Sequence, residues 1–139
     1  MRPAISHTQR TDILEHSKRI AVVGASPNPS RPSHWISEFL MSKGYEVIPV
    51  NPGHDTLFGL TCYPDVAKIP GDVHVINVFR RSDTVLPIVE AAVNRPEVKL
   101  IWMQDGVYNE EAAELAARHN IPLVMNDCIY RFLMQVNSI

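Results

Sequence analysis

The chain has 139 residues, of which 45% are hydrophobic and 20% are charged, and its formal net charge is -2. This length and composition predict an ordinary globular protein with a single domain over residues 1–139. The small net charge argues against broad attraction to nucleic acid or to acidic membranes, and no apolar run approaches the roughly 18 to 20 residues that a membrane span requires.

The N-terminus and the cysteines point to the same cellular setting. Residues 1–7 lack the apolar core of a signal peptide. Cys62 and Cys128 lie far apart and form no CxxC motif, so we expect neither a disulfide framework nor a metal site. The sequence therefore predicts a cytoplasmic protein with reduced thiols.

In chain order, strand-like apolar runs alternate with helical segments. A modest helix over residues 8–18 is expected to cap the sheet as part of the N-terminal segment 1–18. Runs typical of parallel strands buried on both faces follow at about residues 19–23, 45–50, 73–79, 98–103 and 121–125. Helices are expected at about residues 34–41, 83–94 (capped by Ser82 or Asp83), 110–120 (capped by Asn109) and 127–134, with a short helix near 65–68 in an otherwise irregular segment.

This alternation predicts an α/β fold: a doubly wound, Rossmann-like open parallel sheet of about five strands with helices on both faces. Ligands of such sheets bind beyond the carboxyl ends of the strands, near the point where the strand order reverses. The glycine and polar residues of this chain fall at those strand ends. They include Gly24, Asn51, Pro52, Arg80, Arg81, Gln104 and Gly106.

The loop after the first strand predicts a phosphate site. It runs from Gly24 to Ser33, holds three prolines and Arg31, and leads into a helix whose N-terminal N–H groups favour anions. It is longer than the usual two to six residues of such connections, which favours a binding role over a plain linker. No G-x-G-x-x-G follows Gly24, and the second strand ends in Asn51-Pro52 instead of a carboxylate. Both features disfavour an NAD(P)-dependent oxidoreductase, which stays an alternative.

Catalytic patterns are weaker than binding patterns. Ser26 is not in a G-x-S-x-G elbow, and the six histidines show no HExxH spacing. We identify no catalytic residue, so a binding protein is favoured over an enzyme. Arg80 and Arg81 end the third strand, where forked guanidinium donors match phosphate geometry. The alternative for this pair is one solvent-exposed side chain and one salt bridge.

Several segments, taken together, resemble the small stand-alone CoA-binding proteins with a Rossmann-type domain, which are related to the nucleotide-binding domain of the succinyl-CoA synthetase alpha subunit. The matching segments are IAVVGAS at 20–26, RPS at 31–33, GYEVIPVNP at 44–52, IP at 69–70, VFRR at 78–81, WMQDGVYNEEA at 102–112 and NDC at 126–128. They occur in the same order and at similar spacing over most of the chain.

The resemblance implies that coenzyme A binds along the carboxyl edge of the sheet. The pyrophosphate would lie on Gly24, Ala25, Ser26, Arg31, Pro32 and Ser33. Asn51 and Pro52 would border the adenine and ribose, and Phe79, Arg80 and Arg81 would lie beside the nucleotide and its phosphates. The catalytic histidine of the synthetase lies in a second domain, which we do not expect in this chain, so its chemistry is not transferred.

Two further hypotheses concern the end of the chain. Cys128 could make the protein a CoA-sensing or redox-sensing regulator, for example through a mixed disulfide with CoA. Apolar residues near the C-terminus, Ile129, Phe132 and Leu133, could pack on a second subunit as a homodimer or on their own sheet.

Overall fold

The computed structural model of the protein describes residues 5–136. Its main sheet is parallel and has the strand order β2-β1-β5-β6-β7. The strands are β1 (Arg19–Val23), β2 (Glu46–Val50), β5 (Val75–Val78), β6 (Leu100–Met103) and β7 (Leu123–Val124). The order reverses between β1 and β5, where Val23 pairs with Val78. The predicted doubly wound α/β fold is therefore confirmed.

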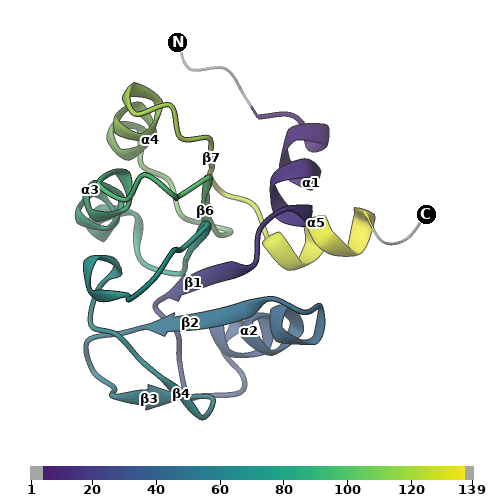
Figure 1. The fold of residues 1–139 in the computed structure, drawn as a ribbon, viewed down its shortest axis with the longest axis vertical. Helices are drawn as coiled ribbons and strands as arrows, with labels where there is room; N and C mark the ends of the chain where they lie inside the picture. The colour runs from purple at the N-terminus through teal and green to yellow at the C-terminus, as the bar shows by residue number, and fades with distance from the viewer. Residues whose placement is uncertain (1–4, 137–139) are drawn as a thin grey trace.

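Helices cover both faces of the sheet (Figure 1). One face packs against α1 (His7–Glu15), α2 (Pro32–Ser42) and α5 (Ile129–Val136), and the other against α3 (Leu86–Val93) and α4 (Glu110–Arg118). Successive residues of β1 join different cores: Ile20 and Val22 face the first group of helices, and Ala21 and Val23 face the second. Both sets are buried, which explains why the strand is apolar throughout.

The helix ends follow the prediction only in part. Asn109 caps α4 as expected, because its side-chain oxygen accepts a hydrogen bond of 2.9 Å from the N–H of Ala112. The expected cap at Ser82 or Asp83 is wrong. These residues lie in a short 3-10 helix, η2 (Ser82–Thr84), and α3 begins without a side-chain cap. The Ser82 hydroxyl instead accepts a hydrogen bond of 2.8 Å from the N–H of Tyr108, which joins the loops after β5 and β6.

The irregular segment after β2 contains a small antiparallel hairpin that the sequence did not indicate. It consists of β3 (Thr56–Leu57) and β4 (Leu60–Thr61), joined by Phe58 and Gly59, both with positive φ. An aromatic residue at φ 57° is unusual, so the segment lacks the typical turn signature. The short helix expected near residues 65–68 is present as the 3-10 helix η1 (Val66–Lys68).

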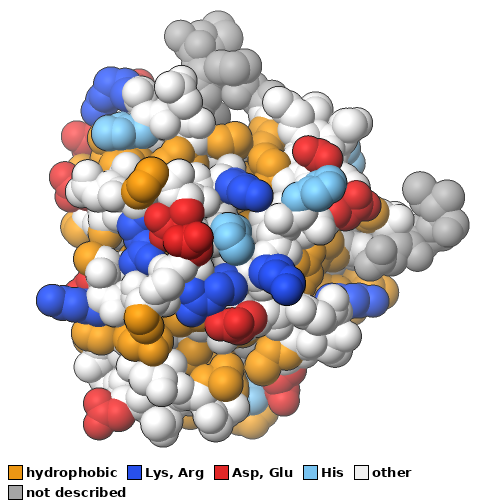
Figure 2. All heavy atoms as spheres, viewed as in Figure 1, with side chains coloured by type: hydrophobic (Ala, Val, Ile, Leu, Met, Phe, Trp, Pro, Cys, Tyr) orange, Lys and Arg blue, Asp and Glu red, His pale blue; other side chains and the backbone are white. Residues whose placement is uncertain are grey.

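Ile129, Phe132 and Leu133 are buried in the core of their own chain, where they pack on their own sheet. Figure 2 shows Lys and Arg side chains beside Asp and Glu side chains on the face in view. Among residues 5–136, no helix is long and apolar enough to cross a membrane. The same residues contain no group of three His, Cys, Asp or Glu side chains placed to hold a metal ion.

Candidate functional site

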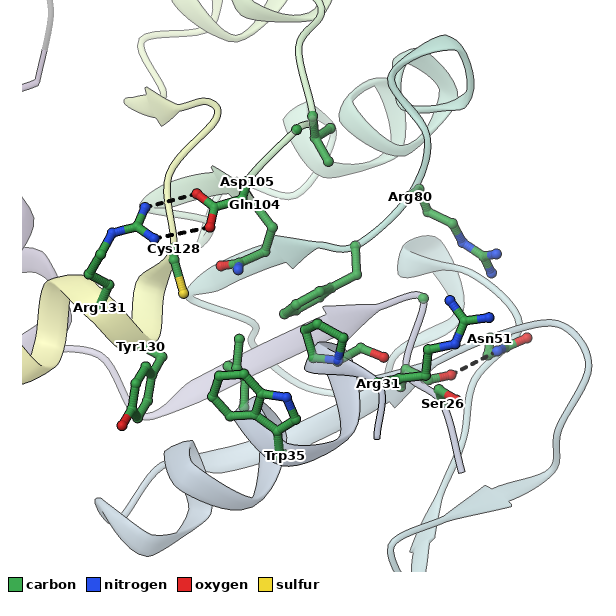
Figure 3. A pocket seen from close by; sticks show the side chains of 18 of the residues that line it. Ser26, Arg31, Trp35, Asn51, Arg80, Gln104, Asp105, Cys128, Tyr130 and Arg131 are labelled. Atoms are coloured by element: carbon green, nitrogen blue, oxygen red, sulfur yellow. Dashed lines mark hydrogen bonds and ion pairs between the residues drawn. The ribbon is translucent and has the colours of Figure 1, made fainter. Parts of the chain in front are cut away.

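A cavity of about 1090 Å³ opens at the carboxyl edge of the sheet, around the point where the strand order reverses. The loops after β1, β2, β5 and β6 line it, together with α2 and α5 (Figure 3). The predicted site residues that line it are Gly24, Ala25, Ser26, Arg31, Pro32, Ser33, Asn51, Phe79, Arg80, Arg81, Gln104 and Gly106. Pro52 is the exception: it is exposed and does not line the cavity.

Gly24 allows the loops after β1 and β5 to meet closely. Its φ is +92°, a region that favours glycine. A Cβ atom at this position would lie 2.5 Å from the carbonyl oxygen of Phe79, closer than real side chains come. The lone glycine therefore has a packing role at the floor of the cavity, although the dinucleotide fingerprint is missing.

Local hydrogen bonds stiffen the loop between β1 and α2. The Ser26 hydroxyl accepts a hydrogen bond of 3.1 Å from the N–H of Asn28, whose side-chain oxygen accepts one of 3.0 Å from the N–H of Ser30. The loop ends at Arg31, where α2 begins without a side-chain cap and with Pro32 in its first turn. The uncapped first turn and the helix dipole favour an anion at this point.

Side chains from outside the loop hold its carbonyl groups. The Asn51 amide nitrogen donates to the oxygen of Ala25 at 2.8 Å. His34 Nδ1 lies 2.9 Å from the carbonyl oxygen of Ser26, and it must carry the hydrogen because a carbonyl only accepts. The His34 ring also meets the Phe58 ring edge to face, with centroids 5.0 Å apart. The hairpin and the end of β2 thus position the loop.

The arginines Arg31, Arg80 and Arg81, which line the cavity, differ in their ion-pair partners. Arg81 lies 3.5 Å from Asp83 in a highly exposed pair. In contrast, within residues 5–136 no acidic side chain forms an ion pair with Arg31 or Arg80. Both guanidinium groups lie on the same side of the cavity in Figure 3. They provide positive charge that no carboxylate of the described residues pairs with.

Gln104 joins the end of β6 to the start of α5. Its side-chain oxygen accepts hydrogen bonds from the N–H of Ile129 at 3.0 Å and from the Asn77 amide at 3.3 Å.

Cys128 follows the last strand, is 7% exposed and lines the cavity (Figure 3). Cys62 lies outside the cavity, and burial is the main cause that raises the pKa of its thiol. Both thiols are free.

An ion-pair network borders the cavity beside α5. Arg131 donates to both carboxylate oxygens of Asp105, at 2.8 and 3.0 Å, and to Asp127 at 3.0 Å. Asp127 also accepts from Arg10 of α1 at 2.8 Å. Burial alone raises the pKa of the Asp127 carboxyl, but hydrogen bonds from Arg10, the Cys128 N–H and Arg131 outweigh it and lower that pKa. Hydrogen bonds to Asp105 and Asp127 raise the pKa of Arg131.

The sequence prediction missed the contribution of the helices to this cavity. The spacing of Trp35 and Phe39, four residues apart, predicts that Trp35 lies on the buried face of its helix, but it is 39% exposed and lines the cavity. Tyr130, Arg131 and Met134 line it from α5. The spacing of Tyr130 and Met134, four residues apart, indicates a shared helix face. The strand order alone does not say which helix face borders the ligand site.

The arrangement is suited to binding and orienting an anionic ligand. The Ser26 hydroxyl accepts a hydrogen bond from the backbone N–H of Asn28. Within the described residues, the cavity-lining hydroxyls of Ser26 and Ser33 and the thiol of Cys128 form no hydrogen bond with a histidine side chain, so these residues make no nucleophile–base pair.

Comparisons with known proteins agree with this geometry. The family described as "CoA binding domain" matches residues 18–133. The uncharacterized protein YneT of Bacillus subtilis is 39% identical over 124 residues, which cover 89% of this chain and 91% of YneT. The ADP-forming acetate–CoA ligase I of Archaeoglobus fulgidus is 29% identical over 125 residues, which cover 84% of this chain but 18% of the ligase. The structure of a hypothetical protein from Pyrococcus horikoshii OT3 matches with a TM-score of 0.91 and 34% identity, over 97% of this chain and 96% of that one.

Proposed function

The chain belongs to the CoA-binding domain family, and we propose that it binds coenzyme A, or an acyl-CoA, in the cavity at the carboxyl edge of the sheet. In this proposal the protein acts as a binding module. The adenine nucleotide lies at the end of the cavity with Arg31 and Arg80, and the pantetheine arm runs toward α5.

One observation carries the proposal: Arg31 and Arg80, unpaired with any described carboxylate, line the cavity beside the uncapped start of α2. The nucleotide end of coenzyme A carries a pyrophosphate and a ribose 3′-phosphate. Guanidinium and backbone N–H groups bind such oxygens with charge-assisted hydrogen bonds. A carboxylate after β2, typical of NAD sites, would repel the 3′-phosphate, and here Asn51 stands instead.

The remaining assignments follow from position. The pyrophosphate would lie on residues 24–26 and 31–33, with Arg80 and Arg81 beside the phosphates and Phe79 beside the nucleotide. Asn51 borders the adenine and ribose while it holds Ala25. Gln104 and Gly106 line the path of the pantetheine arm. Pro52 has no part in the proposal.

Calorimetric titration tests this function. We expect coenzyme A to bind in a one-to-one complex and more tightly than dephospho-CoA, because dephospho-CoA lacks the 3′-phosphate. NAD⁺ should bind weakest, since it lacks both the 3′-phosphate and the pantetheine arm. Absence of binding by coenzyme A and acetyl-CoA at millimolar concentration would overturn the proposal. Tighter binding of NAD⁺ or NADP⁺ would instead favour the oxidoreductase alternative.

A further inference from the structure

The two ends of the cavity differ in chemistry. At the end opposite Arg31 and Arg80 lie Trp35, Tyr130 and Met134, which we call the apolar end. Trp35 and Met134 are 39% and 43% exposed, which is unusual for such large apolar side chains in this chain. In Figure 3 the labelled side chains follow one another from Arg80 and Arg31, through Trp35, to Tyr130.

We propose that the apolar end receives the acyl chain of a CoA thioester, so that the preferred ligand is an acyl-CoA with an uncharged, apolar acyl group. This inference rests on the proposed CoA site, because the nucleotide anchors the ligand and directs its thioester toward α5. The acyl chain would cover apolar surface that is otherwise in contact with water.

The apolar end is preformed. The Tyr130 ring meets the rings of Trp35 and Phe39 edge to face, with centroids 5.1 and 4.7 Å apart. These contacts fix side chains of α2 and α5 against each other. Met134 lies four residues after Tyr130, on the same face of α5, and extends this surface along the helix. Its flexible thioether suits chains of different shape.

The charges at this end disfavour an acyl group with a terminal carboxylate. Arg131 also lines the cavity there, but its donors are directed to Asp105 and Asp127. It is therefore engaged by two carboxylates, and a terminal carboxylate on the acyl group would meet Asp105 as well as Arg131. An apolar chain requires none of these groups to change partners.

The test compares coenzyme A, acetyl-CoA, butyryl-CoA, hexanoyl-CoA and glutaryl-CoA by calorimetry. A fully buried methylene strengthens binding about fourfold, so we expect hexanoyl-CoA to bind about tenfold more tightly than acetyl-CoA even with partial burial. Glutaryl-CoA should bind more weakly than hexanoyl-CoA. Met134→Gln should reduce the tenfold gain of hexanoyl-CoA over acetyl-CoA to about threefold or less. The matched control is Met41→Gln, since this half-buried methionine of α2 lies outside the cavity.

The outcomes separate this inference from the proposed function. Binding of coenzyme A with no gain along the acyl series overturns the inference and leaves the CoA site standing. If Met134→Gln weakens the binding of all these ligands by the same factor, the inference is also overturned. If sedimentation shows a dimer that Met134→Gln dissociates, a second copy covers the apolar end and the inference is wrong. If no CoA compound binds, the proposed function itself fails.

Discussion

Gly24 and Phe79 approach so closely that a Cβ atom on Gly24 would lie 2.5 Å from the Phe79 carbonyl oxygen. The two residues follow neighbouring strands, β1 and β5, between which the strand order reverses. Their contact therefore sets the spacing between the loop from Gly24 to Ser33 and the segment that carries Arg80. This relationship links the stability of the sheet edge to the shape of the cavity.

Replacement of Gly24 by alanine should destabilise the protein and weaken CoA binding. Gly44 provides the matched control: its φ is +95°, close to the +92° of Gly24, but nothing lies within 4 Å of its Cβ position. Gly44→Ala should cost the backbone strain alone, about 1 to 2 kcal/mol. Gly24→Ala adds displacement of the Phe79 carbonyl, which should bring the loss to about 3 kcal/mol or more. Urea unfolding measures both, and equal losses would contradict the packing role of Gly24.

Replacement of Arg80 by alanine should weaken binding of coenzyme A by about 10-fold to 100-fold, the effect of losing a hydrogen bond between charged groups. Dephospho-CoA should lose less affinity, because Arg80 is assigned to the phosphates beside the ribose. Arg118→Ala, at the end of α4, removes the same charge outside the cavity and is the control. Equal weakening of both ligands in Arg80→Ala would place Arg80 away from the 3′-phosphate.

His34 positions the loop between β1 and α2 through its hydrogen bond to the Ser26 carbonyl, and it does not line the cavity. His34→Ala should reduce CoA affinity about fivefold, the effect of losing one neutral hydrogen bond. His34→Asn retains a donor and should recover part of the loss. His119→Ala, at the exposed end of α4, serves as control. Unchanged affinity in His34→Ala would show that the loop keeps its shape without this contact.

The Asp127 network predicts a dependence of stability on pH. The pKa of this carboxyl is lower in the folded chain than in the unfolded chain, so the unfolded state binds more protons at acidic pH. The contribution is complete above the unfolded value, about 3.9, and is lost as pH falls toward the lower folded value. Asp127→Asn should reduce the unfolding free energy at pH 7 by about 2 kcal/mol and flatten the acid decline.

Urea unfolding at several pH values between 3 and 7 checks this prediction, with Asp12→Asn as a control for loss of an exposed carboxylate that contacts His16. An acid decline of the same steepness in Asp127→Asn and in the unmodified protein would contradict it.

The sequence predicted most of the residues that line the cavity because their signals lie at strand ends, and the carboxyl ends of parallel strands meet at one edge. Gly24, Asn51, Arg80 and Gln104 could be assigned in this way. The hairpin at Phe58 had no such signal, since its strands have two residues each and its turn places an aromatic residue at positive φ.

The sequence pattern did not indicate that α2 and α5 line the cavity, and the reason is a different one. Periodicity indicates that a helix has an apolar face, but Trp35 lines the cavity and is 39% exposed. Whether such a side chain contacts protein or ligand depends on how the helix is placed on the sheet. That placement arises from long-range packing, which a local pattern does not contain.

A crystal structure of the protein with coenzyme A tests the central claim most directly. We predict the pyrophosphate on the loop from Gly24 to Ser33, the 3′-phosphate within hydrogen-bond distance of Arg80, and the pantetheine arm directed past Trp35 toward α5. Coenzyme A bound at another surface, or bound in the cavity with its nucleotide on the α5 side, would contradict the account.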